Sequence, residues 1–517
     1  MPNSPVFKPL PKPKLRHSVP SNLSGGIATK KVGATLSQAL VAASWVMHHV
    51  SAGQSLPVVL RELAPSLGQT ALRGACQDLA YQSQRQRGMA DALIRGLTKK
   101  PFDTLDAGVL ALLRTTLALI CNPSQYNAYE AHTVVNQAVE ALPAVLACGL
   151  GKNLPIFQLL AHTNHNTKIV AGFVNGVLRT YLRETDERNK AALKTVEAQF
   201  NHPLWWIERL KKDYPRQWIH LLEQNNYPPV MALRANARIH SALEAQKHLA
   251  QHGILSRCVK GLPNALVLDK PLPVENIPGF SQGWYSVQDL AAQYCVELLD
   301  VQAGHRVLDA CAAPGGKTAH LLERSNITLT ALDNDYLRLE KLRQTLQRLA
   351  KTFIGETPYA PQPLVELQTA NANQTDKWWD GQLFDRIVLD APCSASGVVR
   401  RHPDSRWLRR ASDISNLTVQ QNHLLRSLWA TLKVGGLVLY VTCSVFKAEG
   451  EEQILNFLSH HNNAQLLPSL GHCLPLIRSF DDESSTILTN KISEINLMSF
   501  PNSEQDGFFY ALLRKID

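Results

Sequence analysis

Apolar residues between positions 35 and 185 recur every three to four places, which is the spacing of one face of an α-helix. The clearest two faces consist of Leu36, Leu40, Ala43, Met47 and Val50, and of Val109, Leu113, Leu117 and Ile120. The same stretch contains few of the short apolar runs that are typical of strands. The pattern therefore predicts an all-helical domain over residues 35–185.

The segments on either side of this region have different patterns. Residues 1–34 are rich in proline and poor in apolar side chains, so we expect a disordered tail. Residues 200–283 combine helical periods with short apolar runs such as VMALRA and NALVLD, which predicts a small α+β module. In NHPLWWIERLKKDYP, Trp205 and Trp206 share a face with Leu210, beside two lysines. The module is thus a candidate RNA-binding unit, although core packing is the commoner use of tryptophan.

Residues 284–517 alternate short apolar runs with segments of helix length. The runs are VLDA, TLTALD, LVELQ, RIVLDAP, LVLYVTC and, near the C-terminus, FFYALLR. Such alternation predicts parallel strands joined by crossover helices, in a doubly wound, Rossmann-like α/β domain. Two stretches that interrupt it, GETPYAPQP and SFDDESSTILTN, are expected to be surface loops.

Composition narrows the class of protein and of partner. A chain of 517 residues with 45% apolar content suggests about three domains with full cores. The formal charge of +10 and the pI near 9.1 favour a polyanion such as nucleic acid, although many basic proteins bind none. Nine cysteines without a CxxC pair argue against a disulfide framework or a zinc site and fit a reducing cytoplasm. No apolar run is long enough to predict a membrane span, and the N-terminus lacks the apolar core of a secretory signal.

The first expected strand of the α/β domain leads into a glycine turn, ACAAPGGKT. Asp309 closes the strand, Gly315 and Gly316 form the turn, and Lys317 opens a helix. Such a turn lets a ligand approach the backbone and the positive end of the helix. Asp333 ends the next strand, at an interval where an acidic residue can hold two ribose hydroxyls. NAD, FAD and S-adenosylmethionine all suit this pattern, but the missing GxGxxG and P-loop spacings favour S-adenosylmethionine.

Two further expected strands each end in a cysteine. Cys393 lies in LDAPCSASG, three residues after Asp390, and Cys443 lies in LVLYVTCS. Ligands of open α/β sheets bind beyond the carboxyl ends of the strands, so both thiols are expected beside the cofactor. Such thiols suit methylation of cytosine at C5, a poor nucleophile. A thiolate that attacks C6 makes C5 enamine-like and able to accept a methyl group, after which the C5 proton leaves and the thioether is eliminated.

These motifs resemble those of a known family. LDACAAPGGKT, DAPCSASGVVRRHPD and YVTCS are similar to motifs of the RNA 5-methylcytosine methyltransferases, above all the bacterial 16S rRNA cytosine(967)-C5 methyltransferase B (Sun-type) group. The helical region, which ends in FVNGVLRTYLRE, resembles a NusB-type RNA-binding domain. HPLWWIERLKKDYP and PGFSQGWYSVQDLAAQ resemble the middle region of the family, and DGFFYALLRK its closing strand.

The resemblance implies a function and a role for each catalytic residue. It implies transfer of methyl from S-adenosylmethionine to C5 of a cytosine in 16S rRNA by a cytoplasmic enzyme, which we expect to be a monomer that uses no metal. Cys443 would attack C6 and Cys393 would assist product release, while Asp390 would contact the cytosine and border the methyl donor. The motif order alone does not assign these roles, because DNA cytosine-C5 methyltransferases attack with the cysteine of their PC motif.

The resemblance also implies a cofactor site. Its loop would consist of Cys311, Ala312, Ala313, Pro314, Gly315, Gly316 and Lys317. Asp333 would hold the ribose. Where the family has an aspartate near the adenine, this chain has Asn371, whose amide still forms hydrogen bonds but carries no charge.

The segment VVRRHPDSRWLRR follows Cys393 and is rich in arginine. The residues expected to bind RNA phosphates are Arg400, Arg401, Arg406, Arg409 and Arg410. Trp407 could stack on an unpaired base, or the segment could be a solvated helix face anchored by this tryptophan. A cytosine has to leave its stack to reach a thiol, so a basic surface beside the pocket is expected.

Two alternative functions stay open at this point. The same chemistry could act on a cytosine of tRNA or elsewhere in rRNA, because the motifs specify the reaction and leave the nucleotide to the accessory domains. The chain could also be a non-catalytic RNA-binding factor acting through its helical domain. Retention of Cys393 and Cys443 argues against this second alternative, and Asn371 argues for it.

Overall fold

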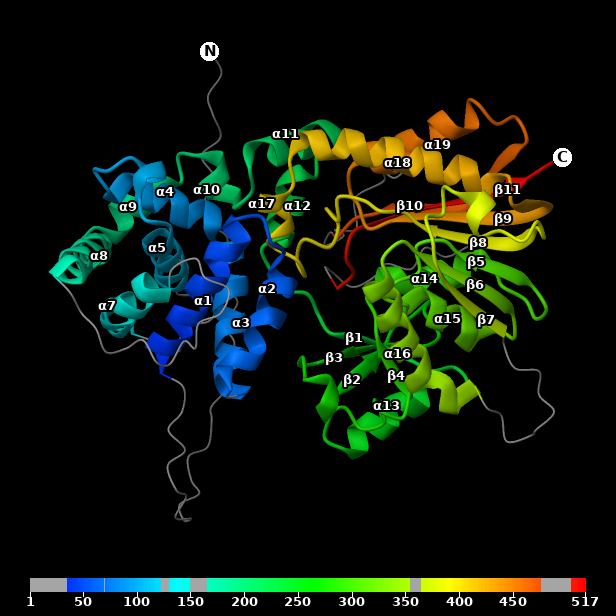
Figure 1. Ribbon diagram of the computed structural model, residues 1–517, viewed down its shortest axis with the longest axis horizontal. Helices are drawn as coiled ribbons and strands as arrows, with labels where there is room; N and C mark the ends of the chain where they lie inside the picture. The colour runs from blue at the N-terminus through cyan, green and yellow to red at the C-terminus, as the bar shows by residue number, and fades with distance from the viewer. Residues whose placement is uncertain (1–34, 69, 122–129, 149–164, 354–363, 476–503) are drawn as a thin grey trace.

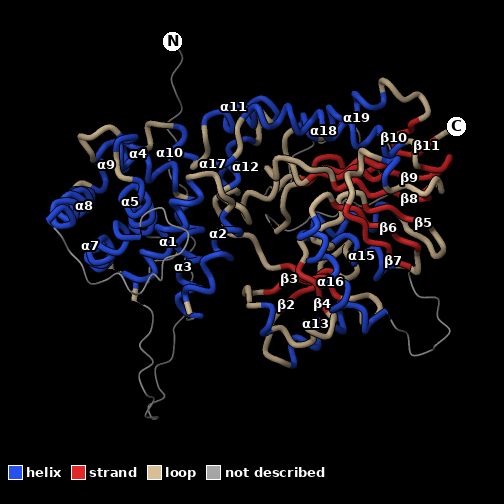
Figure 2. Tube along the Cα trace, viewed as in Figure 1, coloured by secondary structure: helices blue, strands red, loops and turns tan. Residues whose placement is uncertain are grey.

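The computed structural model of the chain describes residues 35–68, 70–121, 130–148, 165–353, 364–475 and 504–517. The tail expected over residues 1–34 and the loops expected at 355–363 and 479–490 lie outside these ranges. The N-terminal helices lie at one end of the molecule and a large sheet lies at the other, with a small sheet beside the large one (Figure 1). Figure 2 shows the same division, with strands confined to the C-terminal part.

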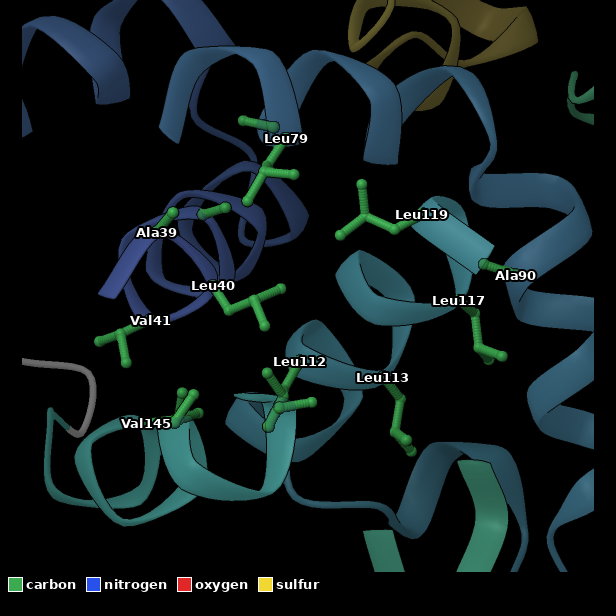
Figure 3. Packing of buried hydrophobic residues seen from close by; sticks show 14 of the residues in the cluster. Ala39, Leu40, Val41, Leu79, Ala90, Leu112, Leu113, Leu117, Leu119 and Val145 are labelled. Carbon is green, nitrogen blue, oxygen red and sulfur yellow. The ribbon is translucent and has the colours of Figure 1, made fainter. Parts of the chain in front are cut away.

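The N-terminal helices pack around one apolar core. They are α1 (Leu36–Ser51), α2 (Leu56–Leu63), α3 (Thr70–Arg85), α4 (Arg87–Leu97), α5 (Ala107–Ile120), α7 (Ala131–Cys148), α8 (His165–Arg183), α9 (Thr185–Ala192) and α10 (Val196–Phe200), with 3₁₀ turns η1 (Ala64–Leu67) and η2 (Phe102–Thr104). Thr35 starts α1 with a capping box to Gln38. Leu40 of α1 and Leu113 of α5 lie fully buried in the core (Figure 3), as their helical spacing predicts. The core continues to Ala198 of α10, beyond the boundary expected at residue 185.

Two short helices connect this region to the sheets. They are α11 (Leu204–Asp213) and α12 (Trp218–Gln224). Trp206 is fully buried and packs edge-to-face on Phe446, with 5.0 Å between ring centroids. The hydroxyl of Tyr214 donates to the carbonyl oxygen of Val445 at 2.7 Å. Trp206 is therefore a core residue, and the two helices brace the chain just after Cys443.

The small sheet is antiparallel, with strand order β2–β3–β1–β4. Its strands are β1 (Ala232–Ala235), β2 (Ser256–Cys258), β3 (Ala265–Leu268) and β4 (Tyr285–Val287), and η3 (Val274–Asn276) precedes β4. Helix α13 (Ala242–Gln251) begins at a capping box between Ser241 and Glu244 and packs on the sheet. The expected strands VMALRA and NALVLD are confirmed as β1 and β3. Because β4 pairs with β1, this sheet extends past the boundary expected at residue 283.

The large sheet has the order β10–β11–β9–β8–β5–β6–β7 in the described part of the chain. Its strands are β5 (Arg306–Asp309), β6 (Thr328–Asp333), β7 (Leu364–Thr369), β8 (Phe384–Asp390), β9 (Leu432–Thr442), β10 (Ala464–Cys473) and β11 (Phe508–Lys515). Strands β5 to β9 are parallel, and β11 runs antiparallel to β9 and β10. The expected Rossmann-like fold class is confirmed. Strand β10 was not expected, because Pro468 and Gly471 interrupt its pattern, and an edge strand tolerates both.

Helices cover both faces of the large sheet (Figure 1). They are α14 (Leu290–Leu299), α15 (Gly316–Arg324) and α16 (Tyr336–Phe353) on one face and α18 (Ala411–Trp429) and α19 (Glu451–Leu458) on the other; α17 (Ser405–Leu408), η4 (Thr375–Lys377) and η5 (Lys447–Glu449) lie in loops. Successive strand residues point to opposite faces, so Val307 packs with α14 and α15 and Leu308 with α18. Burying each such side chain contributes roughly 1.5–3 kcal/mol.

The order of the large sheet reverses beside β5. From β5 the chain continues to β6 and β7 on one side of β5. It then crosses to β8 and β9 on the other side of β5. A ligand crevice forms at the carboxyl ends of the strands where such a reversal occurs. The loops after β5, β8 and β9 all meet there. Across the described ranges, no helix combines the length and apolar composition that crossing a bilayer requires.

Candidate active site

Two thiols meet at this edge of the sheet. The Sγ atoms of Cys393 and Cys443 lie 3.3 Å apart, and both side chains are half-buried. Strands β8 and β9 are parallel neighbours, with Asp390 opposite Val441, so the residues that follow the two strands emerge side by side. The hydrogen bond with Cys443 and burial raise the pKa of the Cys393 thiol well above its ordinary value. Cys393 therefore keeps its proton at neutral pH.

A lysine–aspartate pair lies beside the thiols. Nζ of Lys317, in the first turn of α15, lies 2.6 Å from Oδ2 of Asp390 at the end of β8. Burial lowers the pKa of Lys317, but the carboxylate of Asp390 and neighbouring groups raise it more, so the net shift is upward. The ammonium thus stays charged and holds the Asp390 carboxylate between the glycine turn and the thiols.

The glycine turn crosses the ends of β5 and β6. Gly315 has φ +103°, and a Cβ at this position would lie 2.9 Å from Cγ of Leu342, so only glycine fits. The backbone N–H of Ala312 donates to the carbonyl oxygen of Leu332 at 2.8 Å. Helix α15 begins at Gly316, directly after this turn, and no side-chain cap hydrogen bond is formed at its N-cap, Gly315. The expected loop 311–317 therefore lies beside Asp390 and the thiols.

Two carboxylates underlie this loop. Asp309 is fully buried and accepts a hydrogen bond from Oγ1 of Thr318 at 2.7 Å. Its other oxygen has no hydrogen-bond partner among the described residues, and burial raises its pKa to about 7. Asp333 is also buried, and its Oδ2 accepts from the backbone N–H of Ala313 at 3.2 Å. An acidic floor under an open helix N-terminus fits a cofactor with hydroxyl and amino donors.

Asn371 lies next to Asp333 in the structure. It follows β7, and the adjacent backbone N–H of Ala370 donates to the carbonyl oxygen of Asp333 at 3.0 Å. Its side chain is exposed, and its Oδ1 accepts from the backbone N–H of Asn373 at 3.0 Å. The structure thus places Asn371 beside Asp333, at the end of the neighbouring strand.

The arginine-rich segment differs from the expectation. Arg406 is fully buried and donates to the carbonyl oxygens of Asn201 at 3.0 Å and Asn225 at 2.8 Å. Arg400 is 2% exposed and lies 3.8 Å from a carboxylate oxygen of Asp506. Both guanidinium groups are thus buried within the protein, so neither is placed at the surface where the sequence analysis expected them to bind phosphate.

The other three arginines are more accessible. Arg401 is half-buried and forms ion pairs with Asp289, at 2.7 Å, and with Asp506, so its charge is also compensated. Arg409 donates to the carbonyl oxygens of Cys393 and Ser394, both at 3.4 Å. Arg410 is exposed at the start of α18. Arg409 and Arg410 are the expected RNA contacts that the structure leaves at the surface.

Trp407 anchors the segment to the N-terminal helices. Its Nε1 donates to the carbonyl oxygen of Gln84 at 2.9 Å, and the guanidinium of Arg87 lies 5.3 Å from its ring centroid. The Asp404 carboxylate accepts from the backbone N–H of Leu56 at 2.8 Å. Residues 398–410 therefore connect the thiol loop to the helical region. Trp407 is an anchor, as in the second sequence alternative, but its partners in the helical region were not anticipated.

Sequence reasoning missed two buried charged residues near the site. Arg234 of β1 is fully buried, forms a 2.8 Å ion pair with Glu323 of α15, and donates to the carbonyl oxygen of Gly316 at 3.1 Å. The small sheet thereby supports the glycine turn. Glu449 is also fully buried and lies next to both thiol loops. An arginine within the apolar run VMALRA was a usable signal for Arg234, whereas the polar stretch around Glu449 offered none.

Comparisons with known proteins show which family this chain resembles. A family model described as 16S rRNA methyltransferase RsmB/F matches residues 296–514, and a model of the ferredoxin-like domain of RsmF/B-like methyltransferases matches residues 202–275. Ribosomal RNA small subunit methyltransferase B of Yersinia enterocolitica is 33% identical over 477 residues, which cover 92% of this chain and 98% of that protein. The chain belongs to the methyltransferase B family.

A second relative and a solved structure are also similar to this chain. The methyltransferase B of Vibrio cholerae is 39% identical over 346 residues, or 66% of this chain and 72% of that protein. The crystal structure of PH0851 shares the fold, with a TM-score of 0.68 and 22% identity over 93% of this chain and 99% of that one. This member of the methyltransferase B family contains, among its described residues, no group of three or more His, Cys, Asp or Glu side chains arranged to hold a metal ion.

Proposed function

We propose that this methyltransferase transfers the methyl group of S-adenosylmethionine to C5 of a cytosine in 16S rRNA. The observation that carries the proposal is the contact between the thiols of Cys393 and Cys443 beside the Lys317–Asp390 pair. Family membership supports ribosomal RNA as the substrate, since the relatives are named as small subunit rRNA methyltransferases. A cytosine at position 967 is the target that the motif resemblance implies.

The cofactor lies at the switch point in this proposal. When bound, S-adenosylmethionine supplies an electrophilic methyl group on a sulfonium. The loop 311–317 and the N-terminus of α15 would receive its polar groups, Asp333 would hold the ribose hydroxyls, and Asn371 would bind near the adenine. The partnerless buried oxygen of Asp309 and the acidic floor formed with Asp333 support this placement.

The two thiols have different roles in the proposed reaction. The thiolate of Cys443 attacks C6 of the cytosine and forms an S–C6 bond, which places electron density on C5. Asp390 contacts the base edge, positioned by its ion pair with Lys317. C5 then accepts the methyl group, and the thioether S-adenosylhomocysteine is the leaving group. Water, as the base, takes the proton from C5, and the electron pair of that C–H bond restores the C5=C6 double bond and expels the Cys443 sulfur as the S–C6 bond breaks. Cys393, whose raised pKa keeps it protonated, assists this release by donating a proton to the departing Cys443 sulfur.

RNA binding is assigned to several surfaces. The helical region acts as a NusB-type RNA-binding domain, and the small sheet module contributes a second contact. Arg409 and Arg410 flank the thiol loop and bind phosphates around the extruded base. The enzyme works as a monomer in the cytoplasm, where ribosomal RNA is found, and requires no metal.

One assay tests the proposal. The full-length protein is incubated with labelled S-adenosylmethionine and unmodified 16S rRNA, and the modified nucleotide is mapped. The expected product is a single 5-methylcytosine, with fully modified 16S rRNA as the unreactive control. Label found only in tRNA or in 23S rRNA would show that this RNA, and not 16S rRNA, is the substrate. Tight RNA binding without transfer would favour a non-catalytic RNA-binding factor, an alternative that the uncharged Asn371 supports.

A further inference from the structure

A buried carboxylate joins the two loops that carry the thiols. Glu449, at the end of η5, is fully buried. Its Oε1 accepts from the backbone N–H of Ser394 at 2.8 Å, and its Oε2 accepts from Oγ of Ser444 at 2.6 Å. Ser394 follows Cys393 and Ser444 follows Cys443 in the chain. Each thiol is therefore one residue away from a hydrogen bond to the same carboxylate.

The two loops are also bonded directly to each other around this carboxylate. Oγ of Ser396 lies 2.9 Å from Oγ of Ser444 and accepts from the backbone N–H of Val445 at 2.9 Å. The backbone N–H of Gly397 donates to the carbonyl oxygen of Cys443 at 2.9 Å. Ala395, between the two serines of the first loop, adopts the left-handed backbone with φ 59°. That conformation costs about 1–2 kcal/mol for a residue with a Cβ, so the surrounding bonds have to maintain it.

Hydrogen bonds satisfy the carboxylate of Glu449. Among the ion pairs between described residues, none includes Glu449. Besides its serine donors, it accepts from Nε2 of Gln421 at 3.2 Å, and Gln421 also donates to the carbonyl oxygen of Pro392 at 3.0 Å. A buried carboxylate is costly unless its oxygens are bonded, so the loops and the carboxylate stabilise one another.

We propose that Glu449 is a positioning residue that sets the separation of the Cys393 and Cys443 sulfur atoms. The inference deepens the proposed function and rests on it for its kinetic consequence. Glu449 lies behind both loops and acts through them. Without it the loops separate, and Cys393 no longer reaches the adduct formed at Cys443. Product release then slows, whereas cofactor binding on the far side of Asp390 is retained.

The kinetic test compares Glu449→Ala, Glu449→Gln and the wild type as full-length proteins. The matched control is Gln453→Ala, which removes a buried polar side chain of α19 that donates to the carbonyl oxygen of Thr418 and touches neither thiol loop. Glu449→Ala is expected to slow release about a hundredfold, the scale of an ångström-sized misplacement, and to accumulate a denaturant-resistant protein–RNA adduct. Its affinity for S-adenosylmethionine and that of the control should match the wild type.

Glu449→Gln keeps the size and most hydrogen bonds of the side chain. It should restore release to within about tenfold of the wild type. The negative charge of Glu449 contributes, after Cys443 and burial, to the raised pKa of Cys393. The glutamine variant should therefore shift the alkaline limb of the release profile to lower pH. A purely structural role would restore the rate without this shift.

A second measurement does not depend on activity. Diamide oxidises two adjacent thiols to a disulfide, taking up two electrons and two protons, so the rate of Cys393–Cys443 disulfide formation reports their separation. Glu449→Ala should slow this oxidation about tenfold. Wild-type cross-linking without methyl transfer would overturn the proposed function and leave the positioning role intact. Equal oxidation of Glu449→Ala and wild type would overturn the positioning role itself.

The positioning role of Glu449 can be tested even without a folded Glu449→Ala protein. If Glu449→Ala does not fold, Ser444→Ala replaces it, because this variant keeps the carboxylate and removes one link to the second loop. Slower release and slower thiol oxidation are the expected results. Unchanged values for both would overturn the proposal, as would an equal loss in Gln453→Ala.

Discussion

Sγ of Cys393 lies 3.3 Å from Sγ of Cys443, although 50 residues separate the two cysteines in the chain. The contact follows from the pairing of β8 with β9, since parallel neighbours end at the same edge of the sheet. In the proposed mechanism, this short separation lets both sulfur atoms act on one pyrimidine. Separate roles for the two thiols are thus geometrically possible, and single substitutions distinguish them.

Replacing each cysteine by alanine should give opposite results. Cys443→Ala should abolish methyl transfer, because no thiolate remains to attack C6. Cys393→Ala should form the covalent adduct and release it slowly, because the proton donor of the release step is lost. Denaturing gel electrophoresis of protein with labelled rRNA measures the adduct. An adduct in Cys443→Ala and none in Cys393→Ala would reverse the assignment.

The Asp390 carboxylate can be tested against a second aspartate on the same strand. Asp390→Asn should reduce turnover about a hundredfold, since its charge-assisted contact with the base and with Lys317 is lost. Asp385→Asn at the other end of β8 is the control, because Asp385 forms a 2.7 Å surface ion pair with Lys433 far from the thiols. Single-turnover rates for the two variants should differ by this factor. Comparable losses of single-turnover rate in the two variants would show that Asp390 has no specific role in the reaction.

The arginine-rich segment separates into residues for folding and residues for RNA. Arg406→Met should lower the free energy of unfolding by about 3 kcal/mol, because buried carbonyl oxygens lose their donor. Arg410→Ala should leave stability unchanged, since this side chain is exposed. Its RNA affinity should fall, with the slope of log K against log salt reduced by about one. Chemical denaturation and filter binding at several salt concentrations measure the two effects, and a stable Arg406→Met protein would contradict the buried role.

The buried Asp309 predicts a pH-dependent contribution to stability. Its pKa is about 7 in the folded protein, because burial disfavours the charge, and about 4 in the unfolded chain. The unfolded state therefore loses its proton first as the pH rises. The contribution of Asp309 to the free energy of unfolding is fully present below about pH 4 and is lost progressively up to about pH 7.

Asp309→Asn should remove this pH dependence. The variant should gain melting temperature relative to the wild type at pH 8 and gain little at pH 5, as scanning calorimetry can measure. Asp376→Asn, an exposed aspartate of η4, is the control and should show no such difference. A constant offset between Asp309→Asn and wild type across this range would show that Asp309 is ionised in the folded protein.

Periodicity and motif order in the sequence predicted much of the fold and the strand ends at which the candidate site lies. The short apolar runs predicted β5 to β9 and β11, and the residues that follow β5, β8 and β9 were expected at one edge because parallel strands end together. The thiol pair and the glycine turn are local features of strand ends, so a linear pattern is sufficient to place them. Strand β10 escaped prediction because Pro468 breaks the pattern on which strand recognition depends.

Only the tertiary structure decided which charged residues face solvent. Arg406 and Arg410 belong to one basic run in the sequence, yet the first is enclosed by Asn201 and Asn225 from the connecting helices and the second is exposed. Glu449 resembles its solvated neighbours in the chain, but the fold places it between the two thiol loops. A charge pattern is a property of neighbours along the chain, whereas desolvation and hydrogen bonding depend on neighbours in space.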